Sequence, residues 1–324
     1  MINEHDSFSI PEAIDAECRV LDTTAGRVAY YADTTGGGRP LVLVHSINAC
    51  ASAKEMQPIF EAERGARPVF AIDLPGFGRS ERGDRAYTPA LMAEALLAVL
   101  RDVAPQGADV VALSLGSEIA ALAATLSPDL VHALVVISPT GLGARRKALP
   151  KRERSRNIAA EILGVELIGK ALFAALRTRA SVRYYLGKSF VGAPDPNLVD
   201  YAVLSARAPG ARFAPIAFLS GSLFTADALH SIYDRVSCPV LVLYDQDPYV
   251  DFAELRRFLV GKPRWHAQRI AGTRGLPHFE RGPSTRATID AFLDDRPVET
   301  ELAPSERPRA LTTPTLSPRE PATN

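Results

Sequence analysis

The sequence predicts a doubly wound α/β fold in which a mostly parallel sheet carries an inserted helical segment. Short Val- and Leu-rich runs recur along the chain, and such apolar runs are typical of strands buried on both faces of a parallel sheet. They lie at 41–45, 68–74, 108–114, 133–138 and 239–245. The stretches between them have helical spacing, at 51–63, 88–103, 116–126 and 252–261. Strand and helix alternating in this order predict parallel strands with helices on both faces of the sheet.

The domain boundaries follow from where this alternation starts, stops and resumes. Residues 1–17 are a polar lead-in, and two β-like stretches then flank Ala25-Gly26, which predicts a hairpin turn. We expect the core at 18–138 and 237–295. It ends with a last strand near 265–271, followed by a last helix near residue 290.

Two segments lie outside this core. Residues 139–236 contain helix-like pieces and no convincing strand, so we expect a helical lid inserted above the sheet. The lid opens with a basic stretch, 144–156, which we interpret as a solvated face. Residues 296–324 are rich in Pro, Thr and Glu, and a segment of this composition buries too little apolar surface to offset its ordering entropy. We therefore expect a disordered tail.

The composition excludes several classes of function. Lys+Arg and Asp+Glu both number 37, so no net field attracts nucleic acid or an anionic membrane. Three widely spaced cysteines form neither a disulfide framework nor a metal-ligand cluster. The polar N-terminus is unlike a secretory signal, and no apolar run is long enough to span a bilayer. These features predict a cytoplasmic enzyme with a small-molecule substrate, without a metal, a cofactor, a nucleic-acid partner or a membrane span.

The strongest chemical signal surrounds Ser114. An apolar strand runs directly into this serine, and a helical stretch begins almost at once after it. The flanking Ala112 and Gly116 are small, as a tight strand-to-helix turn requires. Such a turn lifts the serine oxygen above the sheet and places the Leu115 N–H at a helix N-terminus, where it can stabilise an oxyanion. The alternative is that Ser114 only caps the helix.

With four further segments, this motif resembles the α/β-hydrolase family over residues 18–295. The segments occur in the family's order: LVLVHSIN (41–48), DLPGFGRS (73–80), LYDQDPYVD (243–251) and GLPHFERGPSTRATIDAFL (275–293). The resemblance implies the α/β-hydrolase fold with a helical lid and a Ser-His-Asp triad, with Asp247 as the acid and His278 as the base. Ser114, Asp247 and His278 follow the Ser…Asp…His order of this fold.

The resemblance also implies where the oxyanion hole lies. The family's His-Gly pair is His45-Ser46 here, and the N–H of Ile47 is expected to join that of Leu115. Ser46 and Asn48 are candidate side-chain donors, and we expect His45 and Asn48 to contact the substrate.

The DLPGFGRS segment lacks the third glycine of a dinucleotide-binding loop, and no acidic residue ends a following strand at the expected distance. We therefore interpret this segment as a tight structural turn rather than a cofactor site.

The histidine departs from the family pattern. The family commonly has Gly-His at the end of its last strand, with Glu five residues after the histidine. Counting back five residues from Glu280 reaches Gly275, and His278 lies three residues later. Gly275 and Pro277 flank a turn, so we expect a bent loop that brings His278 to Ser114.

These residues predict that Ser114 attacks the carbonyl carbon of an ester, or of a related carbon–carbon bond substrate. A serine at this turn argues against a dehalogenase, which needs an acidic nucleophile there. Apolar lid side chains favour a small, largely apolar substrate; they are Phe173, Leu176, Tyr184, Tyr185, Phe190, Phe218 and Phe224. The alternative, favoured by Gly275, is a non-hydrolytic binding protein or a cofactor-free lyase.

Overall fold

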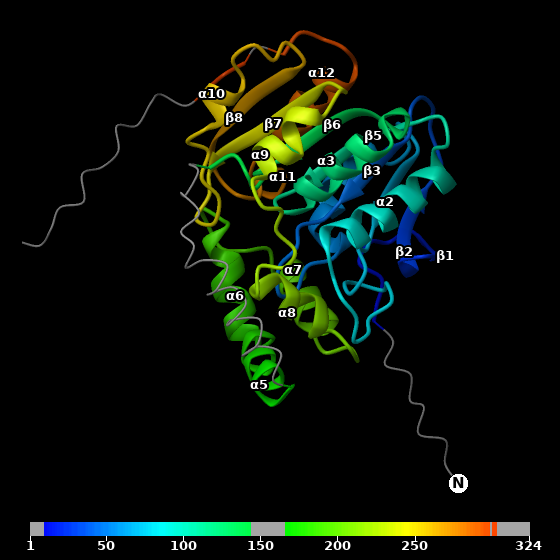
Figure 1. Cartoon of the computed structure of the whole chain (residues 1–324), viewed down its shortest axis with the longest axis vertical. Helices are drawn as coiled ribbons and strands as arrows, with labels where there is room; N and C mark the ends of the chain where they lie inside the picture. Colours follow the sequence, from blue (N-terminus) through cyan, green and yellow to red (C-terminus); the bar gives the residue numbers. More distant parts are fainter. Residues whose placement is uncertain (1–9, 144–165, 299, 303–324) are drawn as a thin grey trace, which may run out of the picture.

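The computed structural model describes residues 10–143, 166–298 and 300–302. Over these residues one eight-stranded sheet has the order β1-β2-β4-β3-β5-β6-β7-β8 (Figure 1). The strands are β1 (Glu17–Thr23), β2 (Gly26–Asp33), β3 (Leu41–Val44), β4 (Val69–Ile72), β5 (Ala108–Leu113), β6 (Val131–Ile137), β7 (Val240–Gln246) and β8 (Trp265–Arg274). β2 pairs antiparallel with β1 and β4, and all other pairs are parallel. The predicted fold class is confirmed.

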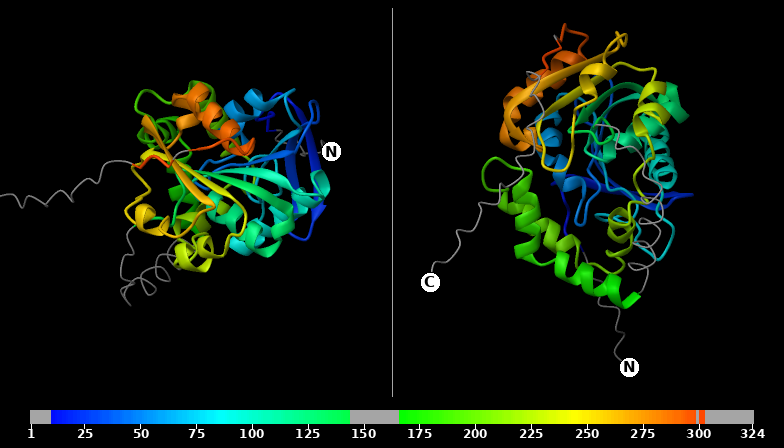
Figure 2. Two further views of the ribbon diagram at one scale, coloured as in Figure 1. Left: turned by 90° about the horizontal axis from the view of Figure 1, so that it is seen from above. Right: turned by 60° about the vertical axis from the view of Figure 1, so that its left-hand side comes forward.

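Helices cover both faces of the sheet, which explains the continuous apolarity of its strands. On one face pack α1 (Gln57–Glu63) and α12 (Gly282–Leu293), and on the other α2 (Pro89–Val103) and α3 (Gly116–Leu126), as the view from above in Figure 2 shows. Side chains of β3 alternate between the two cores, because successive residues of a strand point to opposite faces.

In its described residues, the segment between β6 and β7 contains helices joined by loops and no strand. Its helices are α5 (Glu166–Leu176), α6 (Arg179–Lys188), α7 (Pro196–Ser205), α8 (Phe213–Leu219) and α9 (Ala228–Ser231). The first four lie together beyond one end of the sheet (Figure 1). None of the described helices is long and apolar enough to cross a bilayer. The basic stretch 144–156 lies outside the described residues.

The returning lid segment is tied to the core by a buried carboxylate. Glu118, in the first turn of α3, accepts a hydrogen bond from the Thr225 N–H at 2.9 Å and another from the Thr140 hydroxyl. Burial raises the pKa of Glu118 above its ordinary value, although these hydrogen bonds act to lower it. Both ends of the insertion are therefore anchored beside the helix that follows Ser114.

Two predicted elements differ from the structure. The helix expected at 252–261 is the shorter α10 (Leu255–Phe258). The chain after 295 first returns to the sheet, where Glu301 N–H donates to Ala267 O at 2.9 Å and Glu301 O accepts from Arg269 N–H at 3.3 Å. An edge strand such as β8 offers unpaired backbone groups to any neighbouring segment. Residues 303–324 of the expected tail lie outside the described residues.

Candidate active site

Ser114 occupies a strained turn between β5 and α3. Its φ of 52° lies in the left-handed region, which costs a non-glycine residue about 1–2 kcal/mol. The conformation is held from one side by the Ser114 N–H, which donates to Ile137 O on β6 at 2.8 Å. The side chain is half-buried, and its hydroxyl has no hydrogen-bond partner among the described residues. Strain of this kind is concentrated at functional sites.

The neighbours of Ser114 are small because other backbone passes close by. A Cβ on Gly116 would lie 2.2 Å from the carbonyl oxygen of His45, so the loop after β3 touches the first turn of α3. Ala112 is fully buried, and its carbonyl accepts the Ser117 hydroxyl at 3.1 Å. The absence of a side chain at Gly116 is therefore required by the approach of the two segments.

Two backbone N–H groups lie beside this turn without an acceptor among the described residues. They belong to Leu115, at the N-cap of α3, and Ile47, in the loop after β3. Both side chains are buried, which fixes the backbone that carries the two donors. Unpaired N–H groups at a helix N-terminus suit a developing negative charge.

The other predicted groups of the oxyanion loop are engaged elsewhere. Glu55 Oε2 accepts the Ser46 N–H at 2.8 Å, and Glu55 Oε1 accepts the Asn48 amide at 2.8 Å. The same Asn48 amide donates to Ser46 Oγ at 2.8 Å, while its oxygen accepts the Cys50 N–H. Ser46 and Asn48 thus brace the loop through a buried carboxylate. Both amide hydrogens of Asn48 are used within the loop, which corrects the prediction that Asn48 donates to an oxyanion. The Ser46 hydroxyl acts only as an acceptor here, so its donor role stays a prediction, as does substrate contact by Asn48.

Glu55 is the residue that the sequence did not reveal. It is 4% exposed and lies in the 3-10 turn Ala53–Met56 that precedes α1. The one feature of the sequence that could have indicated a buried role for Glu55 is its position inside a predicted helix that packs on the core.

His45 is a structural residue. It is fully buried, its Nε2 accepts the Leu74 N–H at 3.0 Å, and its Nδ1 donates to the Ser46 carbonyl. The ring also packs edge-on against Phe77. With both nitrogens used and no exposed surface, His45 does not contact substrate, which corrects the prediction.

The segment Asp73–Ser80 is the structural turn that was predicted. Asp73 is fully buried and accepts the Ala53 N–H at 2.7 Å and the Arg79 N–H at 2.9 Å. Gly78 has a φ of 48°, and a Cβ there would overlap the Asp73 carboxyl group. Within the described residues, no group of three or more His, Cys, Asp or Glu is arranged to hold a metal ion.

Asp247 follows β7, two strands from Ser114 in the sheet. One oxygen, Oδ1, accepts the N–H groups of Tyr249 at 2.7 Å and Val250 at 3.0 Å. Burial raises the pKa of Asp247 above its ordinary value, while these two donors and the Ser138 hydroxyl act in the opposite direction. The structure describes no ion pair between Asp247 and a cationic side chain.

His278 is not joined to Ser114 or Asp247. It lies in α11 (Pro277–Glu280), is 3% exposed, and its Nε2 donates to the backbone carbonyl of Glu55 at 2.7 Å. Its Nδ1 is buried without a partner among the described residues. Burial lowers the pKa of His278 to about 4, so the ring is neutral at pH 7. The expected bent loop is therefore corrected: Pro277 starts a helical turn that directs the side chain toward α1.

Gly275 stands where the family pattern has its histidine. It is buried with a φ of 79°, and a Cβ on it would lie 3.0 Å from Asp247 Oδ2. Glu280 fixes the loop, because its Oε2 accepts the Arg274 N–H at 2.7 Å. The position five residues before Glu280 thus faces the acid, and it carries no side chain.

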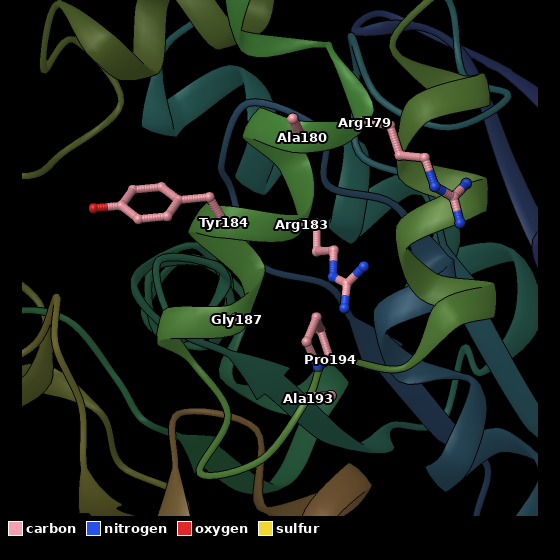
Figure 3. Close-up of a pocket in the computed structure, with 7 residues that line it drawn as sticks. All are labelled: Arg179, Ala180, Arg183, Tyr184, Gly187, Ala193 and Pro194. Atoms are coloured by element: carbon pink, nitrogen blue, oxygen red, sulfur yellow. The ribbon is translucent and has the colours of Figure 1, made fainter.

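Two hollows of the surface lie away from Ser114. A groove of about 750 Å³ follows α6 and is lined by Arg179, Ala180, Arg183, Tyr184, Gly187, Ala193 and Pro194. Figure 3 shows the Tyr184 ring pointing away from the arginines, which come from the same helix. A second hollow of about 450 Å³ lies between α1 and α12 and includes His278. Neither contains Ser114 or Asp247.

Most of the apolar lid residues expected to line the pocket do other things. Phe173 packs with lid alanines, and Phe190 stacks on Phe279 with ring centroids 5.8 Å apart. Tyr184 and Tyr185 are 60% and 47% exposed. Of these residues, Phe173 packs within the lid, Phe190, Phe218 and Phe224 pack against the core, and the two tyrosines are exposed.

Known proteins share the fold of this chain. The model of the alpha/beta hydrolase family matches residues 41–283, three quarters of the chain. The chain belongs to the α/β-hydrolase family. A serine hydrolase involved in carbazole degradation has the same fold, with a TM-score of 0.69 at 18% identity over 86% of this chain and 99% of that one.

Relatives in sequence match shorter stretches. The chain is 41% identical over 93 residues to the esterase Rv0045c of Mycobacterium tuberculosis, covering 28% of this chain and 31% of the relative. It is 30% identical over 121 residues to the uncharacterized hydrolase YugF of Bacillus subtilis, covering 37% and 44%. Each match therefore spans less than half of the relative's length.

Proposed function

We propose that this α/β-hydrolase cleaves an ester or related carbonyl bond through attack by Ser114. One observation carries the proposal: Ser114 is held at a φ of 52° beside the unpaired N–H groups of Leu115 and Ile47. A chain that only needed a helix cap there would gain stability from a relaxed backbone. The names of the two sequence relatives, an esterase and a hydrolase, agree with this reaction class.

The reaction follows from these groups. Ser114 Oγ bonds to the carbonyl carbon, its proton passes to a base, and the carbonyl oxygen becomes an oxyanion. The N–H groups of Leu115 and Ile47 would hold that oxyanion, and one such donor typically contributes about 10²–10³ in rate. Asp247 would stabilise the protonated base. Collapse of the intermediate expels the leaving group, and water releases the acyl group from Ser114.

Labelling with a fluorophosphonate tests Ser114 directly. With imidazole in the buffer as an external base, we expect mass spectrometry to find the adduct on wild-type Ser114 and no adduct in Ser114→Ala. His278→Gln keeps a donor toward the Glu55 carbonyl and removes the imidazole, so it should label as the wild type does. Equal labelling of wild type and Ser114→Ala would contradict the proposal, and loss of labelling in a folded His278→Gln would restore His278 as the base.

A second candidate function is favoured by Gly275. Without a histidine against Asp247, the arrangement of Ser114 and Asp247 also suits a ligand-binding protein or a cofactor-free lyase. Absence of labelling in the wild type and in a variant with a restored histidine would favour this second candidate.

The substrate of the proposed reaction is a small carbonyl compound. The lid segment next to the site is fixed, because Glu280 Oε1 accepts the Val191 N–H at 2.5 Å. Ser189 and Phe190 then lie over the loop that carries Gly275. This close cover favours a compact substrate over a polymeric one.

A further inference from the structure

One carboxylate oxygen of Asp247 faces Gly275. Its Oδ1 is used by two backbone N–H groups, whereas Oδ2 would lie 3.0 Å from a Cβ on Gly275. The Ser138 hydroxyl also acts on this carboxylate, but the structure describes no cation beside it. A half-buried carboxylate without a cationic partner favours a ligand that brings a positively charged N–H donor.

The separation of Ser114 and Asp247 calls for a bridging group. β6 lies between β5 and β7, so two strand spacings, about 10 Å, separate Ser114 from the level of Tyr244 on β7, and Asp247 follows three residues later. Ser114 N–H bonds to Ile137 O and Ser138 N–H bonds to Leu243 O, which keeps the three strand ends in register. No hydrogen bond joins the side chains of Ser114 and Asp247, and a single direct bond cannot cover the distance.

The described histidines do not bridge this gap. His45 and His278 are bound to backbone groups elsewhere, and His230 pairs with Asp234. His132 and His266 belong to β6 and β8, at residues far from the carboxyl ends of those strands.

We propose that the bridging base comes from the substrate: a nitrogen base, such as an amine or imidazole group, binds between Asp247 Oδ2 and Ser114 beside Gly275. This inference rests on the proposed function and names its substrate class. Ser189 of the lid also borders the position, since a Cβ on Gly275 would lie 3.3 Å from Ser189 Cβ. The group is therefore confined between the acid, the lid and the nucleophile.

In this proposal the substrate nitrogen takes the Ser114 proton and passes it on, as the histidine does in a Ser-His-Asp triad. The neutral nitrogen accepts the Ser114 proton as Oγ bonds to the carbonyl carbon, and the resulting cation pairs with Asp247. When the tetrahedral intermediate collapses, the bond to the leaving group breaks and the cation returns its proton to that group. A nitrogen on the acyl part remains in place, so it can then activate the water that hydrolyses the acyl-enzyme.

Hydrolysis of p-nitrophenyl acetate, an ester without a basic nitrogen, tests the inference on the full chain. We expect little turnover by the wild type and a saturable increase with added imidazole, at least about ten-fold above the Ser114→Ala background, since general-base catalysis typically gives 10²–10⁴. Asp247→Asn should remove most of this increase. An amine-bearing ester, p-nitrophenyl dimethylaminobutanoate, should be cleaved faster than its isostere p-nitrophenyl methylhexanoate, each relative to Ser114→Ala.

A histidine placed in the chain provides the matched comparison. Gly275→His should hydrolyse p-nitrophenyl acetate without imidazole and lose the response to it. Gly272→His is the control, because Gly272 has nearly the same φ, 76°, but is exposed and faces Arg281 instead of Asp247. It should retain the imidazole response.

The outcomes separate the inference from the proposed function. Ser114-dependent turnover by the wild type that equals Gly275→His and ignores imidazole would overturn the inference, because the chain would hold its own base. Activity in Gly275→His without an imidazole effect in the wild type would also overturn it, while Ser114 would stand as the nucleophile. If neither imidazole nor Gly275→His produced Ser114-dependent turnover, the proposed function itself would fail.

Discussion

The turn around Ser114 and the loop from Gly275 to His278 contribute differently to one site. At the first, the strand, the strained serine, the small neighbours and the following helix all match the sequence prediction. At the second, the predicted base is directed toward α1 and bonded to Glu55, while a glycine faces the acid. The conformation of a residue set in a local turn can thus be predicted from neighbouring residues, whereas the position of a side chain that must reach across the sheet cannot.

One added methyl group should disrupt the close packing around Ser114. Gly116→Ala places a Cβ 2.2 Å from the His45 carbonyl, so the oxyanion loop or α3 must move. We expect a loss of about 3 kcal/mol in the free energy of unfolding, the upper part of the usual range for overpacking, together with loss of labelling at Ser114.

Gly282→Ala is the matched control for this change. Gly282 is also the first residue of a helix, α12, but a Cβ there would meet no atom within 4 Å. Urea unfolding should show a neutral or slightly stabilising effect. Equal destabilisation by the two substitutions would mean that the contact with His45 is unimportant.

The pH dependence of the free energy of unfolding should reveal the structural role of His278. Its pKa is about 4 when folded, against 6.5 in the unfolded chain, so the native state resists protonation. The stability that His278 provides is complete above pH 6.5 and falls as the pH drops toward 4. At pH 5 the loss is about 2 kcal/mol, which His278→Gln should not show.

The measurement is urea unfolding of both proteins at pH 7 and pH 5. Glu63 titrates in the same window, since burial and Asp290 raise its pKa to about 7, and its contribution to stability has the opposite sign. It is present in both proteins, so it cancels in their difference. Parallel pH dependence of wild type and His278→Gln would contradict the buried, neutral histidine.

The smallest expected effect concerns the strain at Ser114. Ser114→Gly and Ser114→Ala both remove the hydroxyl, but only glycine adopts a φ of 52° without steric cost. We expect Ser114→Gly to be more stable than Ser114→Ala by about 1 kcal/mol, visible as a higher Tm. Equal Tm values would show that the turn stores no strain.

Much of the fold and part of the site could be predicted from the sequence. The central strands, the hairpin at Ala25-Gly26 and the helical character of the insertion follow from hydrophobic period and turn residues. Ser114 and the following Leu115 follow from the same local logic. Glu55 could not be assigned, because its carboxylate acts on Ser46 and Asn48 through the fold of the loop.

Backbone conformation and binary patterning are local properties, so the sequence alone indicates which residues form strands and helices and which serine lies between them. What the side chains of different segments meet is set by the folded chain: His45 and His278 bond to backbone groups, and Asp247 faces Gly275. Those contacts depend on the backbone dihedral angles of every residue in a loop. A change of one backbone conformation there redirects a side chain by several ångströms, whereas a hydrogen bond tolerates a few tenths.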